Sequence, residues 1–459
     1  MEYLNIIDKK RADLIATSDY IWDHAEPAFN EYRSSECLRN VLTQEGFTIN
    51  TGLAGMPTAF SARFGAGKPV IGFLGEFDAL ENLGQVAGVT EKCTDGQKYG
   101  HGCGHNLLGT ATLGAAIVAK EYLCSSKHSG TVVYYGCPAE EDGSGKTFMA
   151  RAGIFDELDA ALCWHPDEKT GIRAKTSLAN VKILYSFKGK SAHASKHPFL
   201  GRSALDAVEL MNIGVNYLRE HIIPEARIHY AIIDTGGSCP NIVQDHASVL
   251  YLIRAPRSEQ VQELLGRVNS IAEGSALMTQ TETTSKMVKA CSNYIQNCTL
   301  EKAVYDIMKH TPLPKIDSEE MAFAKEMSIK GLNGYPNANP DKPIFEGLEP
   351  YNGQVELAYG STDVGDVSWI CPTVQIMAAT HVLGTPNHSW QQTAQGKQPL
   401  AHEMMLYVSK VLGVAAVKLF TSPDILERAK IEHKASIGED GYHCPIPNDI
   451  NPMMSVTSS

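Results

Sequence analysis

Three short apolar runs in the first 170 positions each end in polar residues. Val70–Leu74 leads to Glu76 and Asp78, Thr131–Tyr135 leads to Glu140 and Glu141, and Ala160–Trp164 leads to His165. Continuous apolar runs of this kind are typical of strands buried on both faces of a sheet that helices flank. Because open α/β sheets bind ligands outside the carboxyl ends of their strands, we expect these polar side chains to meet at one edge.

The pattern between and after these runs predicts further elements. Leu107–Leu123 has the length and the Ala, Leu and Ile content of a buried helix. Near Ser177 the pattern changes: two shorter strands and one amphipathic helix are predicted there. These are Val181–Leu184, Val249–Ile253 and the helix Ser203–Glu220. A last apolar run, Val374–Ala379, leads to His388.

The length of the chain predicts more than one domain. A chain of 459 residues exceeds the size at which a single hydrophobic core stops growing. We predict an α/β protein whose catalytic domain, residues 1–179 and 292–459, has a mostly parallel central sheet flanked by helices. Residues 180–291 are predicted to form an inserted, smaller α+β domain that serves as a lid and dimerisation domain.

Composition and charge restrict the function and the location. The net charge of −12 argues against nucleic-acid binding, so local cations must hold any anionic substrate. Eleven cysteines at irregular spacings do not resemble a disulfide framework. The N-terminus lacks the apolar core of a secretory signal. Met404–Phe420 is interrupted by two lysines and is predicted to be too short to span a bilayer. We therefore expect a soluble, cytoplasmic protein with no membrane partner.

Cys103 and His105 lie two positions apart in a glycine-rich segment just before the predicted helix. A thiolate and an imidazole suit zinc, whereas a site completed by carboxylate also accepts manganese or cobalt. Glu141, His165 and His388 complete a candidate set of five ligands, with Glu140 beside them as a base. The alternative is a core cysteine with surface histidines and a solvated carboxylate.

Five segments occur in an order that matches a known family. They are Glu76–Leu80, His101–His105, Pro138–Glu141, Ala192–Ala194 and Asn387–Ser389. This ordered set resembles the dinuclear metal amidohydrolases related to aminoacylase, hippurate hydrolase and glutamate carboxypeptidase. Ile21–Pro27, with Glu31, resembles the N-terminal helix of that family. The resemblance covers nearly the whole chain and implies two divalent metal ions, zinc or manganese, per subunit.

The resemblance also implies roles for individual residues. Glu141 is the expected ligand and Glu140 the general base, while Asp78 orients a group of the metal site. His193 is expected to hold the developing oxyanion, in its own active site or in that of a partner subunit. Asn241 and Arg254 are expected to contact the substrate, with a turn asparagine and a surface arginine as the alternatives. Glu76 departs from relatives that have histidine at its position, so its role as a ligand is left open.

Further segments resemble one subgroup of the family, and the resemblance implies a substrate class. They are Gly100–Gly109, Tyr135–Pro138, Gly143–Met149, Leu200–Val208, Ser361–Trp369 and Tyr442–Pro447. The subgroup cleaves the amide between an aromatic acyl group and glutamate, and it implies a homodimer or a heterodimer with a homologous subunit. Dipeptides or other N-acyl amino acids are alternative substrates, and a catalytically idle partner subunit is an alternative role. Gly143–Thr147 lacks the full glycine spacing of a phosphate loop, which argues against nucleotide binding.

Overall fold

The computed structural model describes residues 3–94 and 96–452, and they form two compact units. The first unit comprises the described parts of Met1–Lys175, Ile295–Glu356 and Val367–His443. The second comprises Thr176–Tyr294, Leu357–Asp366 and the described residues from Cys444 onward. Long-range hydrogen bonds explain why 357–366 joins the second unit although the sequence-based boundaries left it outside. Leu178 N donates to Gly360 O, and Ser292 Oγ donates to Asp366 Oδ1.

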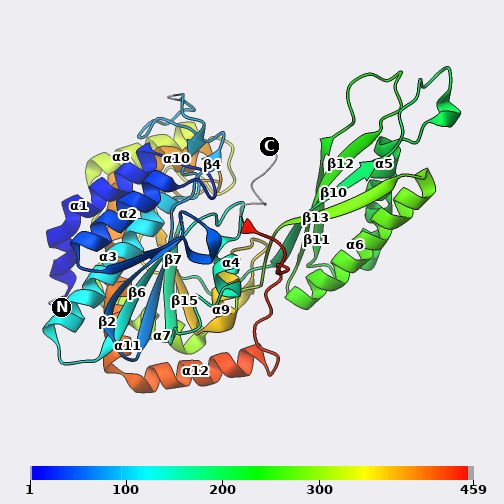
Figure 1. The fold of residues 1–459 in the computed structure, drawn as a ribbon. Helices are drawn as coiled ribbons and strands as arrows, with labels where there is room; N and C mark the ends of the chain where they lie inside the picture. Colours follow the sequence, from blue (N-terminus) through cyan, green and yellow to red (C-terminus); the bar gives the residue numbers. More distant parts are fainter. Residues whose placement is uncertain (1–2, 95, 453–459) are drawn as a thin grey trace. The chain divides into compact units, whose positions relative to one another are not determined.

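The first unit contains a seven-stranded sheet in the order β1-β2-β6-β3-β7-β15-β8 (Figure 1). Its strands are β1 (Thr48–Thr51), β2 (Phe60–Ala66), β3 (Val70–Glu76), β6 (Gly130–Cys137), β7 (Ala160–Asp167), β8 (Gly171–Ile172) and β15 (Thr373–Ala379). The central strands β6, β3, β7 and β15 are parallel to their neighbours within that group. Every residue of β3, β6 and β15 is buried, as expected for strands covered on both faces. The predicted strands and the mostly parallel α/β fold are confirmed.

Helices surround this sheet, and α3 is the most buried of the long ones. The helices of the first unit are α1 (Leu4–Asp23), α2 (Tyr32–Gln44), α3 (His105–Ser125), α4 (Gly145–Arg151), α7 (Cys298–His310), α8 (Ser318–Glu326), α10 (Trp390–Gln395), α11 (Pro399–Thr421) and α12 (Pro423–Ile437). Helix α3 packs against β3 and contacts both α1 and α11. Short elements complete the chain: β4 (Leu80–Glu81), β5 (Tyr99–Gly100), β9 (Lys175–Thr176), β14 (Glu356–Leu357) and α9 (Val364–Ile370).

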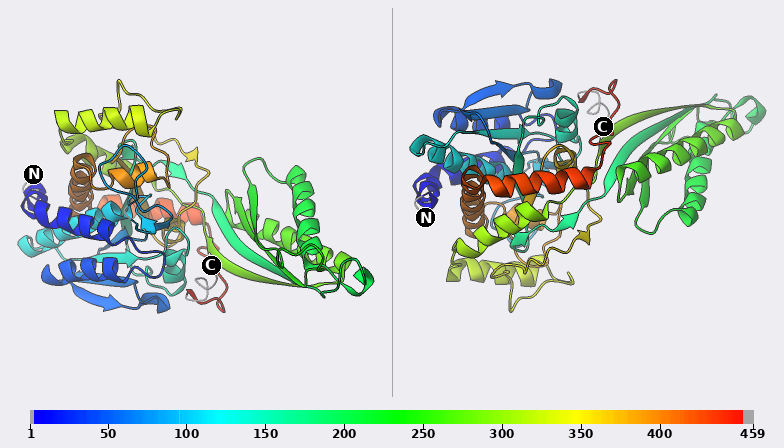
Figure 2. Two further views of the ribbon diagram at one scale, coloured as in Figure 1. Left: turned by 90° about the horizontal axis from the view of Figure 1, so that it is seen from above. Right: turned by 90° about the horizontal axis from the view of Figure 1, so that it is seen from below.

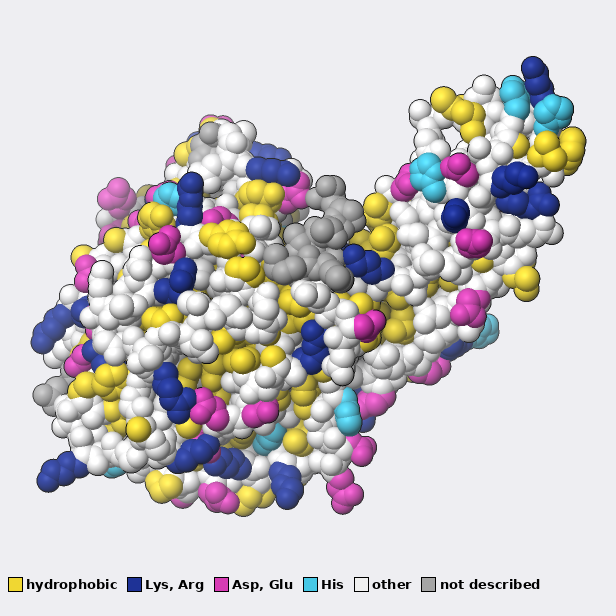
Figure 3. All heavy atoms as spheres, in the orientation of Figure 1, with side chains coloured by type: hydrophobic (Ala, Val, Ile, Leu, Met, Phe, Trp, Pro, Cys, Tyr) yellow, Lys and Arg dark blue, Asp and Glu magenta, His cyan; other side chains and the backbone are white. Residues whose placement is uncertain are grey.

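Among the helices that the structure describes, two, α3 and α11, are long and apolar enough to cross a membrane by length and composition. The prediction that the apolar run near Met404 is too short was wrong, because the helix begins at Pro399 and ends at Thr421. In the structure, however, 83% and 72% of their most apolar windows are buried inside the protein. The two helices pack against each other, as core helices do. On the face of the first unit drawn in Figure 3, basic and acidic side chains are interspersed.

The second unit is built on an antiparallel sheet in the order β11-β12-β10-β13. Its strands are β10 (Ala179–Lys188), β11 (Arg227–Asp234), β12 (His246–Ala255) and β13 (Glu282–Cys291). Burial alternates along β10 and β12, so one face is the core face. Helices α5 (Ala204–Leu218) and α6 (Ser258–Thr279) pack against each other and cover that face (Figures 1 and 2). Strand β11 lies at the edge of the sheet.

Candidate metal centre

The polar residues that follow the parallel strands lie at one edge of the sheet, as their positions predict. Glu76 is the last residue of β3 and pairs in register with Cys137, the last residue of the parallel neighbour β6. Glu140 and Glu141 follow Cys137 in the turn that leads into α4. His165 lies near the end of β7, which is parallel to β3. Carboxylates from the end of β3 and from the turn after β6, and an imidazole from β7, thus lie at the same edge of the sheet.

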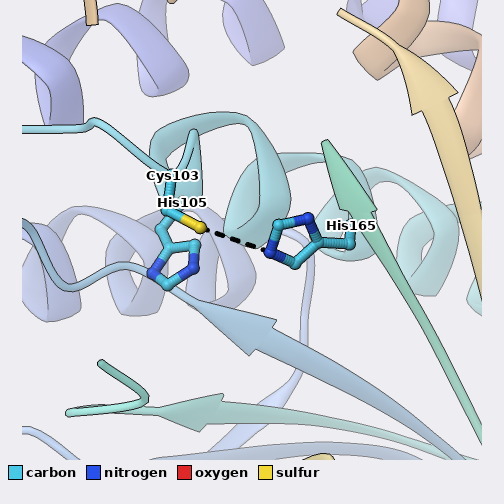
Figure 4. A group of neighbouring side chains, drawn as sticks. All are labelled: Cys103, His105 and His165. Carbon is cyan, nitrogen blue, oxygen red and sulfur yellow. Dashed lines mark hydrogen bonds between the residues drawn. The ribbon is translucent and has the colours of Figure 1, made fainter. Parts of the chain in front are cut away.

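Cys103 and His105 enter this edge from the turn before α3. His105 is the first residue of the helix, and the preceding Gly104 has a left-handed φ of +74°. A side chain at Gly104 would lie 2.9 Å from the Pro166 ring, so glycine lets the turn approach the end of β7 closely. Cys103 Sγ lies 3.3 Å from His165 Nε2, and the side chains of Cys103, His105 and His165 converge (Figure 4).

His388 reaches the same place from the loop between β15 and α10. Its backbone N donates to Gly102 O at 3.0 Å, which ties this loop to the turn that carries Cys103. His388 has a left-handed φ of +55°, and its Nε2 lies 3.2 Å from Glu141 Oε1. It is the most exposed of the candidate ligands, with 52% of its side chain accessible. The site is therefore open to solvent on the His388 side.

Asp78 is buried and connects two of the candidate ligands. Its Oδ1 accepts a hydrogen bond from His105 Nδ1 at 2.8 Å, and its Oδ2 accepts one from Glu141 N at 2.9 Å. The bond to Nδ1 leaves the Nε2 lone pair of His105 to face the centre of the group. His105 Nε2 is buried, and no hydrogen bond within the described residues satisfies it.

Within residues 3–94 and 96–452, the potential ligand atoms fall into three overlapping groups whose members lie within 4.8 Å of one another. The groups are Cys103 with His105 and His165, Cys103 with Glu141 and His388, and Glu76 with His105 and Glu140. The structure therefore brings together all five residues of the predicted ligand set. The two adjacent glutamates belong to different groups: Glu141 lies with Cys103 and His388, and Glu140 lies with Glu76 and His105.

The electrostatics of the group reflect its burial and its close contacts. Burial alone would lower the pKa of His105, but Cys103 and Asp78 outweigh this effect and hold that pKa well above its ordinary value. Hydrogen bonds with Cys103 and then Glu141 raise the pKa of His388 to about 10. Burial, and then the charge of Arg173, hold the pKa of His165 well below its ordinary value. Strongly perturbed groups gathered at one strand edge are typical of functional sites.

Lys146 is a member of this region that the sequence patterns did not identify. It lies in α4 with a fully buried side chain, and its Nζ is 2.6 Å from Glu76 Oε1. The other oxygen of Glu76 lies 3.3 Å from His105 Nε2. Lys146 belongs to Gly143–Met149, a segment that resembles the subgroup but to which the sequence assigned no individual role. The one available signal was Glu76 itself, because a buried carboxylate needs a counter-charge, but the sequence does not indicate which cation supplies it.

The remaining predicted residues lie in the second unit. His193 and Asn241 are both exposed and lie on paired segments, since His193 bridges Ile242 and Ala194 N donates to Asn241 O. His193 Nδ1 accepts from the backbone N of Ser195 and Lys196, so its Nε2 is the nitrogen that carries the proton. Arg254 lies in β12, and its Nη1 donates to Ser361 Oγ at 3.1 Å. All the candidate metal ligands lie in the first unit, whereas His193, Asn241 and Arg254 lie in the second.

Known proteins resemble this chain in sequence and in fold. Residues 72–391 match the model of the peptidase family M20/M25/M40. The chain is 45% identical to the B subunit of p-aminobenzoyl-glutamate hydrolase of Escherichia coli, over 97% of this chain and 96% of that protein. It is 27% identical to the Xaa-Arg dipeptidase of Mus musculus, over 95% of this chain and 92% of that protein.

One solved structure with a similar fold is a Bacillus subtilis protein described as a dinuclear metal binding peptidase from the M20 family. The match has a TM-score of 0.57 at 16% identity and covers 90% of this chain and 99% of that one. The α/β fold was predicted from the apolar runs and the family from the ordered motifs, and both are confirmed, as is the prediction of an enzyme that hydrolyses amide bonds. The chain belongs to the peptidase family M20/M25/M40.

Proposed function

We propose that this protein hydrolyses the amide bond of p-aminobenzoyl-glutamate and releases p-aminobenzoate and glutamate, with two divalent metal ions, zinc or manganese, per subunit. The observation that carries the proposal is the convergence of Cys103, His105, Glu141, His165 and His388 at one edge of the parallel sheet. The 45% identity to a hydrolase of this substrate supports its identity. We also place the protein in the cytoplasm, because its cysteines are present as thiols in the structure, as is typical of proteins in a reducing compartment.

The residues present fit a metal centre. His105 Nε2 is a buried nitrogen that lacks a hydrogen bond within the described chain, as expected of an atom reserved for a metal. Thiolate, imidazole and carboxylate together suit zinc, and the carboxylates also suit manganese. Cys103, His105 and His165 would form one side of the centre, and Glu141 and His388 the other. A bound pair of divalent ions supplies an acidified water and a polarised carbonyl.

The side chains around the centre divide the remaining work. Glu140 takes the proton of the attacking water and returns it to the departing nitrogen, since its carboxylate lies beside His105 and it stands outside the five proposed ligands. Asp78 holds the ring of His105 and the backbone of Glu141 in place. His193 Nε2 donates a hydrogen bond to the developing oxyanion, in this subunit or a partner. Asn241 and Arg254 bind the glutamate carboxylate.

The state of Arg254 supports a role in anion binding. Burial lowers the pKa of its guanidinium, and its Nε is buried without a hydrogen-bond partner among the described residues. A guanidinium with an unused donor suits a carboxylate, which accepts two parallel hydrogen bonds from an arginine. An N-acyl amino acid with a free carboxylate therefore suits the site better than a neutral amide.

A second candidate function is a dipeptidase or another N-acyl amino acid amidohydrolase with the same chemistry. The similarity to the Xaa-Arg dipeptidase supports this alternative. A non-catalytic partner subunit is a weaker alternative, because an idle copy has no chemical need for Glu140 beside a complete ligand set. The E. coli relative is named as the B subunit of its hydrolase, which supports a heterodimer with a homologous A subunit, and a homodimer is the other possible assembly.

The second unit is the part that we propose for self-association. Its edge strand β11 exposes Tyr230, Ile232 and Ile233, with 39%, 42% and 54% of their surface accessible. An exposed apolar edge strand offers unpaired backbone groups to another chain. We expect neither nucleic acid nor a membrane as a partner.

The test is purification with bound-metal analysis, followed by a release assay. The assay covers p-aminobenzoyl-glutamate, dipeptides with C-terminal arginine and acetylated amino acids, with and without the co-expressed A subunit. The proposal predicts about two metal ions per chain and the highest kcat/KM on p-aminobenzoyl-glutamate. A higher kcat/KM on a dipeptide would select the second candidate. Metal without hydrolysis of any substrate, even with the A subunit, would select the idle partner.

A further inference from the structure

Phe29 and Ala139 are among the residues with side chains that have left-handed backbones, at φ +63° and +59°. They lie in different segments of the first unit, yet both donate their backbone N–H to one atom. Phe29 N lies 2.9 Å and Ala139 N 2.8 Å from Oε1 of Glu31. A left-handed backbone is unfavourable for residues with a side chain and persists where the surroundings hold it. The shared oxygen of Glu31 is the group that holds both.

Glu31 is itself fixed in place. It is fully buried, and its other oxygen, Oε2, accepts a hydrogen bond from Thr58 Oγ1 at 2.8 Å. The carboxyl group is therefore held by two backbone donors on one side and a hydroxyl on the other. A buried acid with this arrangement is a rigid anchor for the segments that it joins.

Ala139 is the residue before Glu140, so its backbone sets the direction in which the glutamate pair leaves β6. The turn is held at a second point by Asp78, whose Oδ2 accepts from Glu141 N at 2.9 Å. Within the turn, Gly143 N donates to Ala139 O at 3.0 Å. A side chain at Gly143 would lie 2.3 Å from the ring of Phe29, so the left-handed Phe29 packs its ring against the same turn.

We propose that Glu31 is a positioning residue that clamps the Phe29 and Ala139 turns through one acceptor oxygen and thereby aims Glu140 at the metal centre. The proposal rests on the proposed role of Glu140 as the base. A base must be held near its target before reaction, because a small misplacement lowers the rate of proton transfer. Glu31 belongs to none of the potential ligand groups among the described residues, so its role is one of positioning.

The length of the side chain, and not its charge, is what the clamp requires. Glu31→Gln keeps an oxygen at the same reach, and the Thr58 hydroxyl can accept from the new amide. Glu31→Asp keeps the acid but withdraws it by one methylene from Ala139 N. We therefore expect Glu31→Gln to keep kcat within about threefold of the parent, and Glu31→Asp to lower kcat by about tenfold or more at unchanged KM.

Two further variants separate positioning from general stability. Thr58→Val removes the donor to Oε2 and leaves both clamped N–H groups paired, so kcat should stay near that of the parent. Ala139→Gly in the Glu31→Asp background should recover part of the lost kcat, because glycine adopts the left-handed backbone without a clamp. Metal content, measured on every variant, should equal that of the parent.

Hydrogen exchange of the Phe29 and Ala139 amides tests the clamp independently of catalysis. Both should be protected in the parent and in Glu31→Gln, and exchange faster in Glu31→Asp. If the parent cleaves no amide but exchange follows this pattern, the proposed function fails and the clamp stands. Glu31→Asp with parental kcat and protection would overturn the clamp, as would a Gln variant that loses kcat while the Asp variant keeps it. Loss of bound metal in both variants would also overturn it.

Discussion

The two sheets carry their candidate functional residues in different ways. In the first unit the candidate ligands lie at the ends of parallel strands that are buried on both faces. Buried hydrogen bonds hold them in place, since Asp78 accepts one from the ring of His105 and one from the backbone of Glu141. In the second unit the sheet is antiparallel and one-faced, and His193 and Asn241 lie on exposed segments beyond its strands. Parallel strands bring residues distant in sequence to one buried edge, whereas a one-faced sheet presents residues on a surface.

Because of this difference, substitutions in the two units should impair the protein in different ways. Changes in the first unit should alter metal content, the chemical step or stability, because its residues are buried and coupled. Changes in the second unit should alter substrate binding or assembly and leave the metal in place. Substitutions in both units test that separation, from the largest expected effect to the smallest.

Replacement of Cys103 should have the largest effect. Cys103, like His105, belongs to two of the three potential ligand groups found among the described residues, so Cys103→Ala removes a donor from both of its groups. We expect loss of most of the bound metal and nearly all activity, with the fold retained. Elemental analysis and circular dichroism measure these outcomes, and Cys163→Ala, a buried cysteine of β7, is the matched control. Parental metal content in Cys103→Ala would remove Cys103 from the ligand set.

Glu140→Gln should retain the bound metal and lower kcat. Removal of a general base typically lowers kcat by roughly 10²–10⁴-fold. Glu141→Gln should instead lower the metal content, because Glu141 lies with Cys103 and His388. Single-turnover assays and metal analysis of the pair distinguish the two roles. The opposite result, metal loss in Glu140→Gln alone, would exchange them.

Lys146→Met should destabilise the first unit. The variant leaves Glu76 as a buried charge without its ion-pair partner at 2.6 Å, which typically costs about 3–5 kcal/mol. Addition of Glu76→Gln should restore most of the loss. Urea unfolding measures both, and Lys410→Met, which breaks an exposed pair with Asp8, should cost less than about 1 kcal/mol. Equal losses in the single and double variants would mean that the two residues are not coupled.

Arg254→Ala should change substrate preference and leave the metal unchanged. We expect a loss of about 2–5 kcal/mol in transition-state stabilisation on p-aminobenzoyl-glutamate and a much smaller loss on its α-amide. The measurement is kcat/KM on both substrates. If the two substrates lose equally, Arg254 supports the fold of the second unit through Ser361.

Ile233→Lys should have the smallest effect on catalysis. A lysine on the exposed edge strand β11 opposes strand pairing with another chain, so self-association should weaken while the fold and the metal content stay unchanged. Analytical ultracentrifugation of the variant and of Ile431→Lys, an exposed position on α12, measures this effect. Association constants equal to those of the parent would place the interface elsewhere.

The sequence alone predicted the candidate ligands and the order of the elements around them. The apolar runs predicted β3, β6, β7 and β15, because strands buried on both faces need uninterrupted apolar residues. The motifs predicted the family, because their residues and their order along the chain can be read without a structure. The candidate ligands could therefore be proposed from the sequence, and the structure shows that they lie close together.

Only the tertiary structure decided which distant residues share an environment. Nothing in the local pattern indicates that Lys146 pairs with Glu76, or that Glu31 accepts hydrogen bonds from both Phe29 and Ala139. Likewise, segment 357–366 joins the second unit through hydrogen bonds to residues far away in sequence. Hydrophobic periodicity reports the solvent exposure of single elements, whereas buried charge pairs and shared acceptors depend on the packing of several elements against one another.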